Sequence, residues 1–286
     1  MSNEQNFRWA LVLSEYEHQG EPAQAAKSQI WQAAIGLQQV DGLSTSEHLL
    51  EAAREHIEGR LTIDEVQARI ESHYIKAADE SQDSCRTREA DLVASRIAEL
   101  LGDAAFQFST RTYFNIHKKL FEGIYPHAGS IRPYNITKKE WVLNGDTVRY
   151  CDCDVILDAL NYDFERERKS SSGGLSTEQQ ITRISRFISD VWQIHPFGEG
   201  NTRTTAVFLI QYLKQLSFPV NVAPFAKHAG FFRNALVRAN WSNMPLDIQS
   251  STLPLERFLS NVILGTDFEL RNRTLHIFFS ADAVKQ

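Results

Sequence analysis

The stretch HPFGEGNTR, residues 195–203, lies between two runs of apolar residues with helical spacing. The run before it falls within 181–192, and the run after it extends over 204–213. Ser176 and Gln179 have the spacing of a capping box just ahead of the first run. The sequence therefore predicts two helices joined by a short polar turn, which opens the second helix.

The turn combines side chains that suit phosphoryl transfer. Gly200 lets the backbone approach a ligand closely, and the unpaired N–H groups of a helix start attract anions. Arg203 adds a cation, Glu199 supplies a hard oxygen ligand for Mg²⁺, and His195 is a base that titrates near neutral pH. An anion cradle, a metal carboxylate and a base thus occur within one short stretch.

Each of these residues has a simpler explanation when it is taken alone. His195 would cap a helix, Glu199 would be a solvated loop carboxylate, and Arg203 would lie on a helix surface. His195 and Glu199 also have the spacing of a zinc pair, but Pro196 prevents both from lying on one regular helix face, and the sequence contains no HExxH motif. The phosphoryl-transfer interpretation therefore depends on the combination.

The combination closely resembles the signature of the Fic (filamentation induced by cAMP) family, H-P-F-x-[D/E]-G-N-G-R-x-x-R. The matching residues are His195, Pro196, Phe197, Glu199, Gly200, Asn201 and Arg203. Fic proteins mostly transfer AMP from ATP to a hydroxyl side chain of a target protein. The resemblance implies that His195 deprotonates this hydroxyl and that Glu199 binds Mg²⁺. It also implies that the phosphates of ATP are bound by Gly200, Asn201, Thr202 and Arg203.

The sequence departs from the family signature at two positions. Thr202 replaces the second Gly, a change that phosphate binding through backbone N–H groups tolerates. Ala206 replaces the final Arg, which in the family contacts the terminal phosphate. The loss of this Arg leaves the nucleotide specificity open, so that another nucleotide or the family's rarer phosphate transfer are alternatives to ATP and AMP.

The N-terminal residues 1–78 have the periodicity of helices. Within them, the segment 35–43 and its continuation to Glu65 resemble the VbhA-type antitoxin domain, which occurs beside Fic toxins or fused to them. An ordinary helical extension is the alternative. In such toxin–antitoxin pairs an inhibitory Glu pairs with the second Arg of the motif. Here Asp41 stands at the Glu position and Ala206 at the Arg position, so this lock is not expected to operate, and whether the region inhibits stays open.

The remaining chain divides by composition into three parts. The polar segment 79–89 is expected to be a linker, 90–265 a Fic domain, and 266–286 a C-terminal tail of no evident role. Residues 116–132 resemble the segment that precedes the Fic flap. The expected fold is mainly α: a Fic-type helical domain with a small β-hairpin flap, plus an N-terminal helical domain.

Residues 141–150 carry Asn144-Gly145 between β-favouring residues, which predicts a hairpin with a type I′ turn. A plain surface hairpin is the alternative to the Fic flap. By resemblance, the flap edge holds the target segment by strand addition and presents its Ser, Thr or Tyr hydroxyl to the nucleotide. Further on, Asn240 lies in a segment that resembles the family's cover over adenine, so Asn240 is expected to hydrogen-bond the base.

The composition restricts location and partners. A net charge of -6 argues against general nucleic-acid binding, and three cysteines are too few for a disulfide framework. The apolar run at 7–13 is too short and wrongly flanked for a signal peptide or a membrane span. A cytoplasmic protein with no membrane role is therefore expected.

The leading hypothesis is a Mg²⁺-dependent nucleotidyltransferase, a protein adenylyltransferase that uses ATP as substrate. A regulatory or binding protein with the Fic fold and weak catalysis is the alternative from another class. The resemblance also implies possible self-modification and homodimers. The target protein, the acceptor residue and the oligomeric state do not follow from the sequence.

Overall fold

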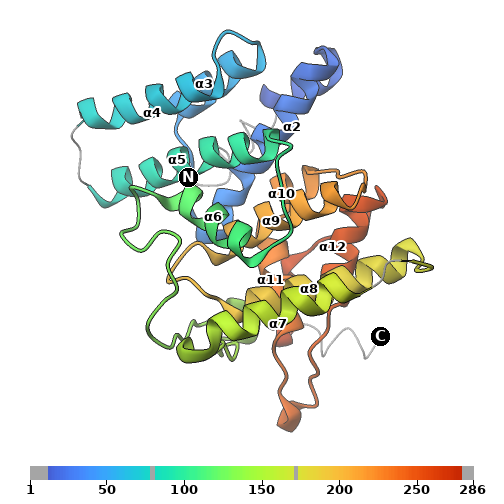
Figure 1. Cartoon of the computed structure of the whole chain (residues 1–286). Coiled ribbons are helices and arrows are strands. Elements are labelled where there is room, and N and C mark those ends of the chain that lie inside the picture. Colours follow the sequence, from blue (N-terminus) through green and yellow to red (C-terminus); the bar gives the residue numbers. More distant parts are fainter. Residues whose placement is uncertain (1–11, 78–80, 171–172, 279–286) are drawn as a thin grey trace. The chain divides into compact units, whose positions relative to one another are not determined.

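The computed structural model describes residues 12–77, 81–170 and 173–278 (Figure 1). Helices dominate these residues, and within the described ranges the only β pairing is one isolated bridge between Asn243 and Ile248. The prediction of a mainly α fold is confirmed. By contacts, the chain divides into two compact units.

Unit 1 contains the described residues up to Phe106, together with Lys118–Ala128 and Val222–Ala229. A helical segment at 12–19 precedes the labelled helices. The labelled helices of the unit are α2 (Pro22–Gly36), α3 (Glu47–Ile57), α4 (Ile63–Ala77), α5 (Gln82–Gly102) and the short α10 (Ala223–Lys227), and a 3-10 turn, η1 (Leu37–Asp41), follows α2.

Helix α2 forms the centre of unit 1 and packs against α5 and α10. Proline at its first turn and a capping box between Glu21 and Gln24 start the helix, and its last turns are buried. A Cβ atom on Gly36 would lie 2.2 Å from the carbonyl oxygen of Ala226, so only glycine permits this approach of α2 to α10.

The predicted linker at 79–89 was wrong for 82–89, which form the first turns of α5. Ser81 caps this helix by accepting a hydrogen bond from the N–H of Ser84, and Arg86 donates to the carbonyl of Gly42 at 2.9 Å. The segment is polar because these turns are largely exposed, and continuous burial begins only at Ala90. A solvated helix start therefore has the composition of a linker.

Unit 2 contains 107–117, 129–221 and the described residues from 230 onward. Its helices are α7 (Ile156–Lys169), α8 (Thr177–Ile194), α9 (Asn201–Gln215) and α12 (Leu253–Ile263); α6 (Thr110–Phe121) and α11 (Ala229–Ala239) begin or end in the other unit, and short 3-10 turns occur at Trp141–Leu143, Cys153–Val155, Met244–Leu246 and Asn272–Leu275. Helix α8 packs against α7, α9 and α12.

The predicted helices around the polar turn are confirmed. The capping box of α8 is present, with the Ser176 N–H donating to Gln179 Oε1 at 2.9 Å. Helix α9 is buried from Asn201 to Leu213, and its buried residues include the polar side chains of its first turn as well as the apolar run that follows. Phe108 packs against the C-terminal part of α9, and its ring centroid lies 4.6 Å from that of Tyr212.

The predicted β-hairpin at 141–150 is corrected, because no strand is assigned to these residues. Trp141–Leu143 forms a 3-10 turn, which ends where Asn144 and Gly145 adopt positive φ angles of 53° and 87°. The consecutive residues Val142 and Leu143 are both buried, so this arm does not alternate between two faces as a strand would. The Asn-Gly turn was correctly predicted, whereas the paired strands were not.

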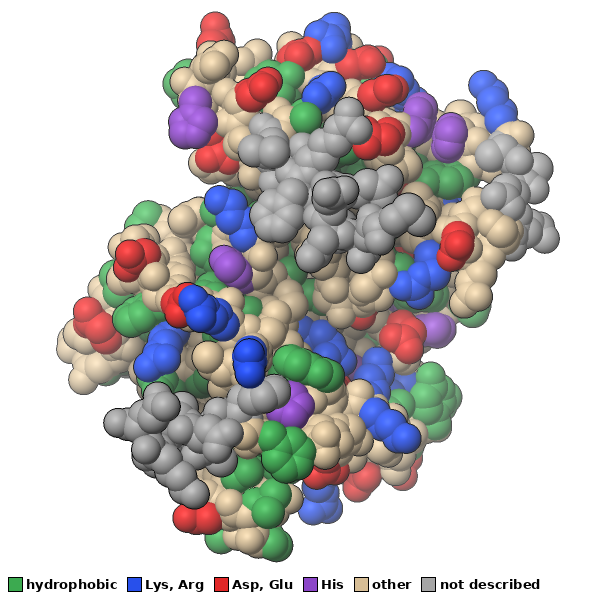
Figure 2. All heavy atoms as spheres, turned by 180° about the vertical axis from the view of Figure 1, so that it is seen from behind, with side chains coloured by type: hydrophobic (Ala, Val, Ile, Leu, Met, Phe, Trp, Pro, Cys, Tyr) green, Lys and Arg blue, Asp and Glu red, His purple; other side chains and the backbone are tan. Residues whose placement is uncertain are grey.

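On the face in Figure 2, acidic and basic side chains are interspersed. In the described part of the chain, every helix is too short or too polar to cross a membrane. Residues 266–278 of the predicted tail are held partly by Asn261, whose Nδ2 donates to the carbonyl of Phe268 at 2.8 Å. The rest of that tail lies outside the described residues.

Candidate active site

The polar turn between α8 and α9 is held in shape by backbone conformation and by Asn201. His195 ends α8 in the left-handed region at φ 50°, and Gly200 begins α9 at φ 76°. Asn201 closes the turn, because its Oδ1 accepts from the N–H of Phe197 at 3.0 Å and its Nδ2 donates to the Phe197 carbonyl at 2.8 Å. The side chains between 195 and 203 therefore project from a fixed loop.

His117 supports the same turn from α6. The N–H of Gly129 donates to His117 Nδ1 at 2.8 Å, so Nε2 carries the proton and donates to the carbonyl of Glu199 at 3.0 Å. The imidazole also stacks on the ring of Phe197 at a centroid distance of 3.6 Å. His117 thus acts as a structural residue beneath the turn.

His195 has the tautomer that a general base requires. Its Nδ1 lies 3.1 Å from the carbonyl of Trp192, which can only accept, so Nδ1 carries the proton and Nε2 has the free lone pair. The side chain is buried, and burial, followed by the charge of Lys138, holds the pKa of His195 well below its usual value. His195 is therefore neutral at pH 7.

Arg132 is a residue of the site that the motif did not reveal. It is 3% exposed, and its Nε donates to the carbonyl of His195 at 2.8 Å, while its backbone N–H donates to the carbonyl of Pro196 at 2.9 Å. Its other guanidinium nitrogens donate to the carbonyls of Tyr134 and Cys151. The cation thus joins the C-terminal carbonyls of α8 to both ends of the 134–151 loop.

Glu140 and Arg233 form a second group that sequence analysis missed. Glu140 is 1% exposed and forms an ion pair with Arg233, in which Nη2 donates to Oε1 at 3.0 Å and Nη1 lies 2.7 Å from Oε2. It also accepts from the hydroxyl of Tyr150, whose ring centroid lies 4.5 Å from that of His195. Since Glu140 lies far from Arg233 in sequence, no local spacing signals this pair.

Glu199 is available as a ligand for Mg²⁺. Its side chain is 57% exposed, and Lys138 Nζ lies 3.3 Å from its carboxylate. Among the described residues, no group of three or more His, Cys, Asp or Glu side chains is arranged to hold a metal ion. A single carboxylate together with phosphate oxygens is an ordinary Mg²⁺ environment, so Glu199 is the residue of this turn that could hold such an ion.

The first turn of α9 contains the predicted phosphate-binding residues. Thr202 Oγ1 accepts from the indole Nε1 of Trp192 at 3.0 Å, so the residue that replaces glycine is tied to α8. Arg203 is 1% exposed in this structure. Ala206, at the position of the missing Arg, is fully buried. The structure therefore places His195 and the residues from Glu199 to Arg203 in one turn. The side chain at position 206 carries no charge.

Asn240 lies on a different element from this turn. Its Nδ2 donates to the carbonyl of Ser189 at 3.1 Å, to Ser189 Oγ at 2.9 Å and to the carbonyl of Leu236 at 3.0 Å. Asn240 therefore ties the end of α11 to α8. The amide oxygen takes no part in these bonds and could accept a hydrogen bond from a nucleobase.

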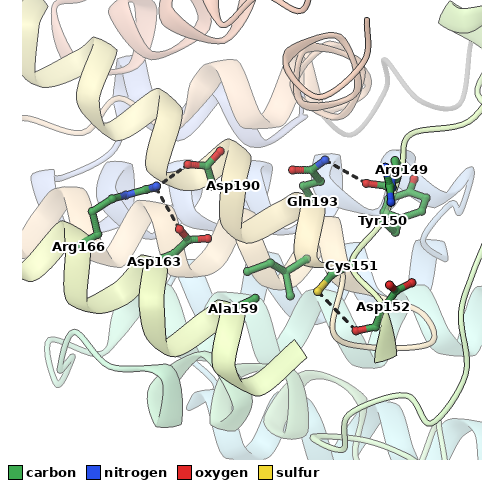
Figure 3. Close-up of a pocket in the computed structure, with 10 residues that line it drawn as sticks. Arg149, Tyr150, Cys151, Asp152, Ala159, Asp163, Arg166, Asp190 and Gln193 are labelled. Atoms are coloured by element: carbon green, nitrogen blue, oxygen red, sulfur yellow. Dashed lines mark hydrogen bonds and ion pairs between the residues drawn. The ribbon is translucent and has the colours of Figure 1, made fainter. Parts of the chain in front are cut away.

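A polar pocket of about 470 Å³ includes Tyr150 and Ile194 in its lining (Figure 3). Arg166 donates to Asp190 at 2.5 Å and lies 3.1 Å from Asp163. Burial raises the pKa of Asp163 to about 6, against the opposing effect of Arg166. The charges of this pocket are thus partly compensated within it.

Comparison with known proteins finds a family match for the region that contains the turn. Residues 107–213 match the Fic/DOC family and form a Fic/DOC family domain. Over 106 residues the chain is 27% identical to protein adenylyltransferase VbhT of Bartonella schoenbuchensis, an alignment that covers 37% of this chain and 21% of that protein. No solved structure matches the chain. The antitoxin-like character of the N-terminal helices stays a prediction.

Proposed function

We propose that the protein is a Mg²⁺-dependent protein adenylyltransferase that transfers AMP from ATP to a Ser, Thr or Tyr hydroxyl of a target protein. The observation that carries this proposal is the buried His195 at the head of the turn, neutral and with Nε2 unprotonated. Its place in a Fic/DOC family domain and the similarity to VbhT support the same activity.

In the proposed reaction, Nε2 of His195 takes the proton of the target hydroxyl. The hydroxyl oxygen forms a bond to the α-phosphorus of ATP, the bond from this phosphorus to the bridging oxygen breaks, and pyrophosphate leaves with the electron pair. The amides of Gly200 to Thr202, with Arg203, would bind the phosphates, and Mg²⁺ held by Glu199 would neutralise part of their charge. Asn240 would accept a hydrogen bond from the base.

The target segment is proposed to pair with the backbone of 146–150. Val148 and Tyr150 are buried in this stretch while Arg149 is exposed, an alternation typical of an extended chain with one face on the protein. Such a chain can accept a partner by strand addition even though it forms no hairpin of its own. Self-modification and homodimer formation are further proposals for the same site.

A second candidate function follows from position 206. Because Ala206 is buried and uncharged, the terminal phosphate lacks the contact that the family signature provides. A protein with the Fic fold that binds a partner but transfers little AMP, or that uses another nucleotide or transfers a phosphate, would have this feature.

Labelling separates these possibilities. Wild type, His195→Ala and the exposed-residue control His18→Ala are incubated with Mg²⁺ and with ATP labelled at the α- or the γ-phosphate, alone and in cell lysate. We expect α-label on protein with wild type and His18→Ala, and none with His195→Ala. Label from the γ-position would indicate phosphorylation, and no label from either would refute the ATP-dependent proposal. Label without lysate would show self-modification.

The N-terminal helices are not tested well by truncation at residue 78. Helix α2 packs against α5 and α10 within unit 1, so removal of 1–78 would expose the buried faces of both. Substitution of exposed residues on α3 or α4 is a sounder test of whether this region inhibits transfer.

A further inference from the structure

Unit 1 contains a pocket of about 440 Å³ between α2, α3, α4 and α5. Its apolar walls are contributed by Ala26, Ile30, Trp31, Ile63 and Ala98, and its polar lining by Lys27, His56, Glu99 and Asp103. This volume, with mostly apolar walls and few polar groups, is typical of sites for small molecules.

The polar wall contains a hydrogen-bond donor with a fixed tautomer. The indole N–H of the fully buried Trp31 donates to His56 Nδ1 at 2.9 Å, so the proton of a neutral His56 is on Nε2. Burial and the charge of Lys27 lower the pKa of His56, which keeps the imidazole neutral at pH 7. In the described part of the chain, no side chain or carbonyl accepts from this Nε2–H.

Lys27 places a cation beside His56. Its Nζ donates to the backbone carbonyl of His56 at 3.1 Å, which leaves further N–H groups, and it has no carboxylate partner among the described residues. The two carboxylates that line the pocket, those of Glu99 and Asp103, have other partners than Lys27. Glu99 accepts from Gln67 at 2.7 Å and forms an ion pair with Lys119, and Asp103 is exposed and accepts from the N–H of Ala105.

The geometry points to a ligand with an apolar body and a carboxylate group. We propose that this pocket binds a small amphipathic carboxylic acid, with the apolar part between Ile30, Trp31 and Ile63 and the carboxylate against Lys27 and His56. Burial of the chain would contribute affinity in proportion to its apolar area, and the charge-assisted bonds would select an acid over a neutral analogue. This site is independent of the proposed transfer reaction.

Calorimetry with octanoate and 1-octanol tests the proposal on the full chain. We expect octanoate to bind wild type more tightly than 1-octanol. Lys27→Met should weaken octanoate binding about tenfold, as the loss of one charge-assisted contact predicts, and leave 1-octanol unchanged. Lys76→Met is the matched control, since Lys76 is exposed on α4 and does not line the pocket, and it should bind both compounds like wild type.

A second variant tests the apolar wall. Ile63 is half-buried at the start of α4, so Ile63→Trp should fill the pocket and abolish binding of both compounds, with the melting temperature reported alongside. If wild type binds no octanoate, or if octanoate binds Lys27→Met and Ile63→Trp as tightly as wild type, the proposal is wrong.

Discussion

Arg132 and His195 are joined by a hydrogen bond of 2.8 Å from the guanidinium Nε to the backbone carbonyl. The same guanidinium bonds to the carbonyls of Tyr134 and Cys151, so one buried side chain sets the position of His195, the proposed base, relative to the loop proposed to hold the target. Arg132 makes these bonds to carbonyls alone, and it therefore acts as a positioning residue for His195.

Arg132→Lys should lower kcat for AMP transfer about a hundredfold and change the KM for ATP little. A lysine keeps the charge but lacks the planar fork that reaches several carbonyls at once, and a small displacement of a catalytic group has an effect of this size. Steady-state kinetics with a purified target tests this. Lys139→Arg, at an exposed position in the same loop but outside the 146–150 stretch proposed to bind the target, is the control. A rise in KM with unchanged kcat would contradict the positioning role.

The pH dependence of transfer should reflect the lowered pKa of His195. Burial disfavours the imidazolium, so the His195 imidazole stays unprotonated as the pH falls through 6.5 and gains its proton only well below that value. The rate should therefore remain flat from pH 7 to pH 6.5 and decline only further into acid. An NMR titration of the His195 ring, identified by its absence in His195→Ala, measures the same pKa. A midpoint at or above 6.5 would refute the assignment.

The sequence predicted the turn well because its signals are local. The capping box at Ser176, the apolar periodicity of α8 and α9, and the glycine that opens α9 each act within a few residues, and each is present in the structure. Arg132 ends the segment 116–132, which resembles the segment that precedes the Fic flap. The sequence therefore indicated the region around Arg132 but not the hydrogen bonds that Arg132 makes.

The two errors have different origins. Residues 82–89 have a linker's composition but are helical, continuous with the buried part of α5 that begins at Ala90. The 141–150 segment has β-favouring residues, yet one arm forms a 3-10 turn directly after Glu140, which is paired with the distant Arg233. Neither the Glu140–Arg233 pair nor the pocket of unit 1 has a signal in the sequence, because both join residues distant along the chain.

Thr202→Val should destabilise the protein by about 1–3 kcal/mol, because it leaves the buried indole N–H of Trp192 without an acceptor. Thr202→Ser keeps the hydroxyl and should cost much less. Urea unfolding followed by circular dichroism gives both values. If Val and Ser destabilise equally, the hydrogen bond contributes nothing and the effect is one of packing.

Asp91 connects α3 and α4 to α5. Its buried carboxylate accepts from the Ser46 N–H at 2.8 Å, the Ser46 hydroxyl at 2.5 Å and the Tyr74 hydroxyl at 2.7 Å. Asp91→Ala leaves these donors unpaired, so the free energy of unfolding should fall by about 3 kcal/mol. Asp83→Ala, exposed on the same helix, should lower the free energy of unfolding by less than about 1 kcal/mol.

Burial raises the pKa of Asp91 above its value in the unfolded chain, so keeping the carboxylate ionised destabilises the folded state, and protonation relieves this cost. The difference in stability between wild type and Asp91→Ala should therefore widen as the pH falls from neutral toward the folded pKa, and a difference that shrinks over this range would contradict the assignment.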